Sequence, residues 1–118
     1  MYLIRKEFHF SASHQLDGLP DGHPCGRLHG HNYRVELVLA AEELDATGFV
    51  VDYGDLRPFQ RLIDDELDHR HLNDVLPCQT SAENIARYLF SRARKHWPQV
   101  LAVRVSETPK TWAEYRES

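Results

Sequence analysis

The chain has little of several features that define large classes of protein. Only 2 of its 118 residues are cysteine, which excludes a disulfide-rich scaffold. Its 14 lysines and arginines are outnumbered by 18 acidic residues, and no basic stripe is present, so a general nucleic-acid surface is excluded. No apolar run approaches the roughly 18 residues of a membrane span, and the first residues lack the apolar segment of a signal peptide. These absences predict a cytoplasmic protein without nucleic-acid or membrane partners.

What the chain has in excess is histidine, with 8 residues. No repeat, linker or low-complexity tract divides the sequence, so we expect a single domain over residues 1–118. Alternating apolar residues predict strands over residues 2–14 and 33–39, separated by an irregular loop over 15–27 that is rich in glycine and proline. Loops of this length are usually functional.

Two helices are expected in the second half of the chain. Asp55 is the expected N-cap of the first helix, because this start places Pro58 in the first turn, whereas a cap at Asp52 would place the proline in the interior. The run Thr80-Ser81-Ala82-Glu83 fits a capping box and predicts the start of the second helix, which Pro98 ends.

Strands are expected over residues 101–106 and 112–115, which completes the order β-β-α-α-β-β. This order predicts an α+β fold with an antiparallel four-stranded sheet and two helices inserted between strands 2 and 3. The helices would cover one face and leave the other face and the sheet edges for a partner.

Three histidines form a candidate metal site. His29 and His31 lie two positions apart on an expected strand, so both side chains point to the same side. His14 ends the apolar stripe of the first strand. Three neutral imidazoles suit Zn²⁺ and leave a fourth position for water or substrate. Cys25 decides between two readings: a fourth ligand that closes a structural site, or a thiolate reagent beside an open one. Cys78 is interpreted as structural.

Glu107 ends the apolar face of the third expected strand. A buried carboxylate needs hydrogen-bond donors, and a ligand with two adjacent N–H groups would supply them through a paired contact. The alternative is an exposed glutamate that pairs with Lys110. Asp68 directly precedes His69 and would orient it for proton transfer if the backbone there is not helical; the alternative is a polar helix terminus.

Together these pieces resemble the 6-pyruvoyltetrahydropterin synthase family, and within it the bacterial 6-carboxy-5,6,7,8-tetrahydropterin synthase branch. The 3 residues between Cys25 and His29 favour the carboxy-forming branch, since the pyruvoyl-forming enzymes typically carry a longer insertion there. Thr80 departs from the proline that family members often carry before the helix. The resemblance spans nearly the whole chain and rests on Phe8-His9-Phe10-Ser11-Ala12-Ser13-His14, Cys25-Gly-Arg-Leu-His29-Gly-His31, Leu67-Asp68-His69 with Leu72-Asn73, Ser81-Ala82-Glu83-Asn84 and Val105-Ser106-Glu107-Thr108.

The resemblance implies a set of residue roles. It implies zinc held by His14, His29 and His31, and Cys25 as the proton-abstracting base. It further implies His69 with Asp68 as a proton relay, and Glu107 as the anchor of a pterin ring. Thr108 and Arg27 are further candidates for substrate binding, and the candidates for a triphosphate are Arg27, Arg70 and Lys110.

The resemblance also implies the T-fold and a homo-oligomer, a hexamer built as a dimer of trimers with active sites between subunits. The implied reaction converts 7,8-dihydroneopterin triphosphate and water to 6-carboxytetrahydropterin, acetaldehyde and triphosphate, in queuosine biosynthesis. The alternatives are 6-pyruvoyltetrahydropterin formation, or side-chain cleavage of a dihydropterin, on the same fold. A non-enzymatic alternative is a structural or storage protein with a closed Cys-His₃ zinc site.

Overall fold

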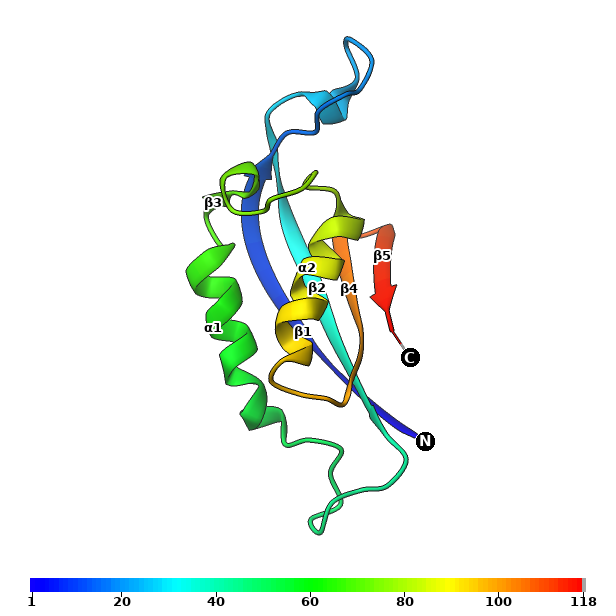
Figure 1. Cartoon of the computed structure of the whole chain (residues 1–118). Helices are drawn as coiled ribbons and strands as arrows, with labels where there is room; N and C mark the ends of the chain where they lie inside the picture. The colour runs from blue at the N-terminus through cyan, green and yellow to red at the C-terminus, as the bar shows by residue number, and fades with distance from the viewer. Residues whose placement is uncertain (118) are drawn as a thin grey trace.

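The computed structural model describes residues 1–117, and the expected domain end at Ser118 lies outside them. A pair of long strands forms the spine of the molecule, and the loop between them extends beyond the rest of the sheet (Figure 1). The elements follow in the order β1 (Tyr2–His14), η1 (Pro24–Gly26), β2 (His29–Ala41), η2 (Tyr53–Leu56), α1 (Arg57–Glu66), β3 (Arg70–His71), η3 (Leu72–Asp74), α2 (Ala82–Arg94), β4 (Val100–Thr108) and β5 (Thr111–Arg116).

The sheet has five strands in the order β3-β1-β2-β4-β5. The four longer strands are antiparallel neighbours, as predicted. The prediction of a purely antiparallel four-stranded sheet is wrong at one edge, where β3 pairs in parallel with Ala12 and Ser13 of β1. A strand of 2 residues is too short to produce an alternating pattern, so its sequence carried no signal.

Both helices cover the same face of the sheet (Figure 1). Apolar side chains from alternate strand positions point toward them, as the period of two requires. On α1, Phe59 packs edge-on against Phe8 of β1 with ring centroids 4.9 Å apart, and on α2, Phe90 packs against Tyr115 of β5 at 5.1 Å. No helix within residues 1–117 is both long and apolar enough to span a bilayer.

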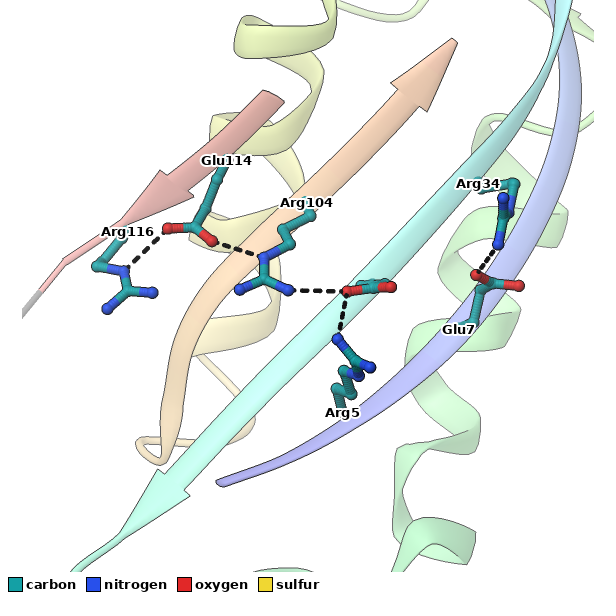
Figure 2. Close-up of polar contacts among 7 residues, drawn as sticks. Arg5, Glu7, Arg34, Arg104, Glu114 and Arg116 are labelled. Carbon is teal, nitrogen blue, oxygen red and sulfur yellow. Dashed lines mark hydrogen bonds and ion pairs between the residues drawn. The ribbon is translucent and has the colours of Figure 1, made fainter. Parts of the chain in front are cut away.

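The other face of the sheet is covered by paired charges rather than by apolar side chains. Figure 2 shows these side chains in front of the strands, with the helices behind. Glu36 of β2, whose side chain is only 16% exposed, accepts from Arg104 at 3.1 Å and lies 3.7 Å from Arg5. Glu114 of β5 joins Arg104 at 2.6 Å and Arg116 at 3.0 Å. One network of charges therefore crosses four strands.

The start of α1 differs from the prediction in one respect. Pro58 lies in the first turn, as expected, but Asp55 is not the N-cap. Asp52 instead accepts from the N–H of Gly54 and begins the 3-10 turn η2, which leads directly into α1. The short turn of different pitch lets Asp52 cap the segment without placing Pro58 inside a helix.

The start of α2 is shifted by one residue from the expected capping box. Ser81, not Thr80, is the N-cap, and its hydroxyl accepts from the N–H of Asn84. Thr80 is fully buried, and its carbonyl contacts His14. Thr80 therefore supports the histidine site, and the hydroxyl of Ser81 caps the helix.

Ser81→Ala should lower the free energy of unfolding by about 1 kcal/mol, because the N–H of Asn84 loses its acceptor. Urea denaturation monitored by circular dichroism measures the change. Ser91→Ala is the matched control, since Ser91 is exposed inside α2, and its effect should be about 0.5 kcal/mol or less, in the stabilising direction. Equal destabilisation by the two variants would contradict the assignment of the cap.

Candidate metal and pterin site

Three histidines meet at the end of the β1–β2 ribbon. In the antiparallel register His14 lies opposite His29, and Ala12 lies opposite His31. Gly30 lies opposite Ser13, and a Cβ at Gly30 would approach the carbonyl oxygen of Ala12 to 3.3 Å. The alternation of the strands turns all three imidazoles to the helix-covered face. One ring nitrogen from each lies within 4.8 Å of the others.

Two backbone carbonyls fix which nitrogen of His14 and His29 carries the proton. His14 Nδ1 lies 2.7 Å from the carbonyl of Thr80, and His29 Nδ1 lies 2.6 Å from the carbonyl of Arg27. A carbonyl only accepts, so both Nδ1 atoms donate and both neutral rings keep a bare lone pair on Nε2. These two Nε2 atoms are 3.0 Å apart. Two lone pairs at this distance repel unless a cation lies between them.

The third histidine brings another nitrogen without a partner. His31 Nε2 is buried and makes no hydrogen bond among the described residues. An orphaned buried nitrogen costs about 1–3 kcal/mol, so a ligand is the natural explanation. Tetrahedral Zn–N bonds of about 2.0–2.1 Å place ligand nitrogens about 3.3 Å apart, close to the separation of His14 and His29. The donor set therefore fits Zn²⁺ and leaves its fourth position open.

The surroundings of His14 and His31 favour the neutral imidazole, which is the form that binds a metal. Burial lowers the pKa of His14 and of His31, although the charge of Glu107 opposes both shifts. Below them Tyr33 stacks on Phe10 with ring centroids 4.7 Å apart. Burial, and then the charge of Glu107, raise the pKa of Tyr33 well above its usual range, so its hydroxyl stays protonated. The site is thus closed from below by a neutral aromatic layer.

Glu107 lies beside this group. Its Oε2 is 3.7 Å from His31 Nε2, and its side chain is 26% exposed. No contact with Lys110 is recorded among residues 1–117, so the alternative of an exposed ion pair with this lysine is not supported. A pocket of about 350 Å³ opens next to Glu107 and includes Val105, Trp112 and Ala113 in its walls. Ser81, Glu83 and Thr111 also line it, so the half-buried carboxylate faces a cavity with both apolar and polar walls.

Cys25 lies outside the histidine group. It sits in the 3-10 turn η1, where it is half-buried. Its carbonyl accepts from the N–H of Leu16 at 3.0 Å, and Leu16 lines the pocket that contains Glu107. Gln15 and Asn73 exchange two hydrogen bonds, which hold the start of the loop against the segment before α2. The loop that carries Cys25 is therefore tethered, through Leu16, to the wall of the carboxylate pocket.

Asp68 and His69 are in direct contact, with His69 Nδ1 2.9 Å from Asp68 Oδ2. His69 has φ +58°, so the backbone is not helical, which was the condition for this contact. Ser11 of β1 anchors the pair: its N–H donates to Asp68 Oδ1 at 2.9 Å, and its carbonyl accepts from His69 N–H. The hydrogen bond from Ser11, followed by that of His69, lowers the pKa of Asp68, so its carboxylate is ionised near neutral pH.

The pair lies at the outer edge of β1, and no contact between it and the triad is recorded within residues 1–117. It borders a pocket of about 480 Å³ whose walls include His31 of the triad. Ser11, Ser13 and Asn32 also line this pocket, and strand alternation turns their side chains to the face opposite the triad.

The remaining predicted binding residues are exposed. Thr108 makes a hydroxyl contact of 3.0 Å with Thr111, and the side chain of Arg27 makes no recorded contact within residues 1–117. The sequence argument did not identify the carbonyls of Arg27 and Thr80, the N–H of Ser11 or the floor residue Tyr33. Backbone groups leave no signal in residue types, whereas the polar hydroxyl of Tyr33 at the end of an apolar stripe was a signal that could have been used.

The sheet and its histidines define an α+β protein with a site able to hold a metal through three imidazoles. A family model described as "6-pyruvoyl tetrahydropterin synthase" matches residues 3–118. The chain belongs to this family, which confirms the resemblance seen in the sequence.

Individual relatives agree with this assignment. The 6-carboxy-5,6,7,8-tetrahydropterin synthase of Haemophilus influenzae is 32% identical, over 99% of this chain and 100% of that protein. The protein of the same name from Synechocystis is 36% identical, over 98% and 93%. The solved structure of the Caenorhabditis elegans 6-pyruvoyl tetrahydropterin synthase superposes with a TM-score of 0.86 at 29% identity, over 99% of this chain and 96% of that one.

The purified protein should hold about one zinc ion per chain, and His29→Ala should remove most of it, because a lone pair is lost from the group. Elemental analysis after dialysis measures the content. His9→Ala is the matched control, since His9 lies on β1 but pairs with Glu7 on the other face. Retention of zinc by His29→Ala, or its loss from His9→Ala, would contradict the assigned ligands.

Proposed function

We propose that this protein is a zinc-dependent 6-carboxy-5,6,7,8-tetrahydropterin synthase. It converts 7,8-dihydroneopterin triphosphate and water to 6-carboxytetrahydropterin, acetaldehyde and triphosphate, a lyase reaction that serves queuosine biosynthesis in the cytoplasm. The observation that carries the proposal is the convergence of three imidazole nitrogens beside the carboxylate of Glu107. The spacing of 3 residues between Cys25 and His29 favours the carboxy product over the pyruvoyl product.

Glu107 is proposed to hold the pterin ring. The guanidine-like edge of a pterin offers adjacent N–H donors, and a carboxylate accepts them in a paired contact. The pocket beside Glu107 supplies apolar contact through Val105 and Ala113. The ring would then lie next to His31, with the substrate side chain directed at the triad.

Zinc at the triad would act as a Lewis acid on the side-chain oxygens of the substrate and make the neighbouring C–H bonds more acidic. The chain supplies the groups that move protons. Cys25 is proposed as the base, because the hydrogen bond from the N–H of Leu16 to the carbonyl of Cys25 keeps its loop at the pocket. The absence of Cys25 from the histidine group speaks against the closed Cys-His₃ alternative.

Asp68 and His69 are proposed to relay protons at the site of a neighbouring copy. Asp68 accepts from His69 Nδ1, which leaves Nε2 of the exposed ring to exchange protons with a bound substrate. No contact between the pair and the triad is recorded within residues 1–117, so we infer that they act on one molecule of substrate across a boundary between two copies. An active site between subunits resolves this separation.

The edges of the sheet support such an assembly. β3 pairs only with Ala12 and Ser13, so the outer edge of β1 from Tyr2 onward has unpaired backbone groups among the described residues. β5 is the opposite edge. Joining β5 of one copy to β1 of the next would satisfy both edges and bring the Glu107 pocket toward the Asp68–His69 pair. Three copies joined in this way would form a ring, and the proposed oligomeric state is a homo-hexamer made of two such rings.

Incubation of the zinc-loaded protein with dihydroneopterin triphosphate should yield 6-carboxytetrahydropterin and acetaldehyde. Mass spectrometry identifies the pterin, and a coupled alcohol dehydrogenase assay detects the aldehyde. Formation of a pyruvoyl pterin would support the alternative product instead of the proposed one. The absence of any pterin product would refute the enzymatic proposal. Cys25→Ala should retain zinc while turnover falls by about 10²-fold or more, as expected for loss of a proton-transfer group.

Mixed oligomers test whether sites are shared. His29→Ala lacks a ligand and His69→Ala lacks the relay, so each variant alone should be nearly inactive. Oligomers co-expressed from both, with different tags, should recover about a quarter of wild-type activity, because one interface in four unites an intact triad with an intact relay. Co-expression of His29→Ala with Cys25→Ala, which impairs the same side of the interface, is the control and should recover none. Equal recovery in both mixtures would show that the sites are not divided as proposed.

A further inference from the structure

The segment that follows β1 keeps its backbone groups paired after the strand has ended. The last pair of the β1–β2 ladder is His14 with His29. Beyond it, the N–H of Leu16 donates to the carbonyl of Cys25 at 3.0 Å. Alternate residues of an extended chain present their N–H and carbonyl groups to opposite edges. Gln15 and Asp17 therefore turn theirs to the edge away from Cys25, where β3 has already ended.

Two side-chain amides take the place of a strand at this edge, and we call Asn73 and Gln79 the amide pair. Asn73 accepts from the N–H of Gln15 at 2.9 Å and donates to its carbonyl at 2.7 Å. Gln79 accepts from the N–H of Asp17 at 3.1 Å and donates to its carbonyl at 2.7 Å. A primary amide carries an acceptor and a donor side by side, as a peptide group does. The amide pair thus satisfies both backbone groups of two alternate residues.

The amide pair is itself held by ordered elements. Asn73 lies in the turn η3 that follows β3. The carbonyl of Gln79 accepts from Nδ2 of Asn84 in α2 at 2.9 Å. Gln79 directly precedes Thr80, whose carbonyl lies 2.7 Å from His14 Nδ1. One short segment therefore supports a histidine of the triad through its backbone and the loop over residues 15–27 through a side chain.

The contacts of the amide pair lead to Cys25 rather than to the substrate pocket. Leu16 lies between the two residues that the amide pair holds, so its N–H is kept pointing at the carbonyl of Cys25. Gln15 adds a second link, because its Nε2 donates to the carbonyl of Gly26 at 2.9 Å. Neither amide belongs to the triad or lines the pocket beside Glu107. The amide pair can therefore affect the reaction only through the loop.

We propose that Asn73 and Gln79 are positioning residues, which fix the loop of Cys25 relative to the triad. The inference rests on the proposed function, because it takes Cys25 as the base. A base must lie within hydrogen-bond distance of the proton that it removes, and a displacement of about 1 Å can cost about 10²-fold in rate. Loss of the amide contacts lets the loop adopt more positions, so the thiol is correctly placed for a smaller share of the time.

Hydrogen exchange tests whether the amide pair fixes the loop. Gln79→Met keeps the approximate length of the side chain but removes its donor and acceptor. In the zinc-loaded protein, exchange over residues 19–27, which make no recorded hydrogen bond with Gln79, should become about fivefold faster by mass spectrometry. Asn73→Leu should act in the same direction. Zinc content should stay unchanged in both variants, because the backbone of Thr80 is unaltered.

Gln60→Met is the matched control for exchange. The amide of Gln60 donates to Asp64 at 2.8 Å within α1, so its loss should leave exchange over residues 19–27 unchanged. Unchanged exchange in Gln79→Met, or an equal increase in Gln60→Met, would overturn the proposal.

A double-mutant cycle tests whether Gln79 acts through Cys25. Gln79→Met should lower kcat by about fivefold and change KM for dihydroneopterin triphosphate less than kcat. In the Cys25→Ala background the same substitution should leave the residual turnover unchanged, since no thiol remains to be positioned. An equal fall in both backgrounds would assign Gln79 to general stability of the fold and refute the positioning role. A rise in KM at unchanged kcat would refute it as well.

The two experiments separate this inference from the proposed function. Faster exchange in Gln79→Met, in a protein that forms no pterin product, would confirm that the amide pair fixes the loop and refute the proposed activity. Product formation at the wild-type rate in Gln79→Met would refute the role of the amide pair and leave the proposed activity standing.

Discussion

The register of β1 against β2 is the constraint on which the rest of this structure depends. It places His14 opposite His29 and brings His31 to the same face, and it places Ser13 opposite Gly30 on the other. A slip of one residue would turn every side chain of a strand to the wrong face and would disperse both the triad and the pocket beside β3. The buried side chains of Phe8, Tyr33 and Leu37 hold the register, because the slipped arrangement would expose them.

Two backbone carbonyls, one of them from the residue before the N-cap of α2, then set the orientation of the histidine rings that the register brings together. The carbonyls of Thr80 and Arg27 orient two imidazoles so that their free nitrogens face each other. Thr80 is able to do so because it precedes α2 and is buried, while Ser81 takes the cap. The stability of α2 and the geometry of the histidine group are coupled through two adjacent residues.

The proposed chemistry is divided between subunits. Metal ligands and the carboxylate pocket lie on the helix-covered face, and the Asp68–His69 pair lies at the outer edge of β1. The charge network across β1, β2, β4 and β5 makes the face opposite the helices unsuited to an apolar cover (Figure 2). An assembly that joins sheet edges leaves these charges paired and hydrated, and brings the two halves of the site together.

The sequence by itself determined the α+β order of strands and helices, the candidate histidines and the family, because periodicity, capping residues and motif spacing are written in residue types. It placed the caps of α1 and α2 imperfectly, since Asp52 and Thr80 compete with neighbours of similar propensity. Only the tertiary structure decided that β3 exists, that His69 turns through φ +58° to meet Asp68, and that carbonyls set the histidine tautomers. Each of these depends on backbone groups or on contacts between distant segments, such as Ser11 with Asp68, and residue types do not encode which carbonyl will lie beside which ring.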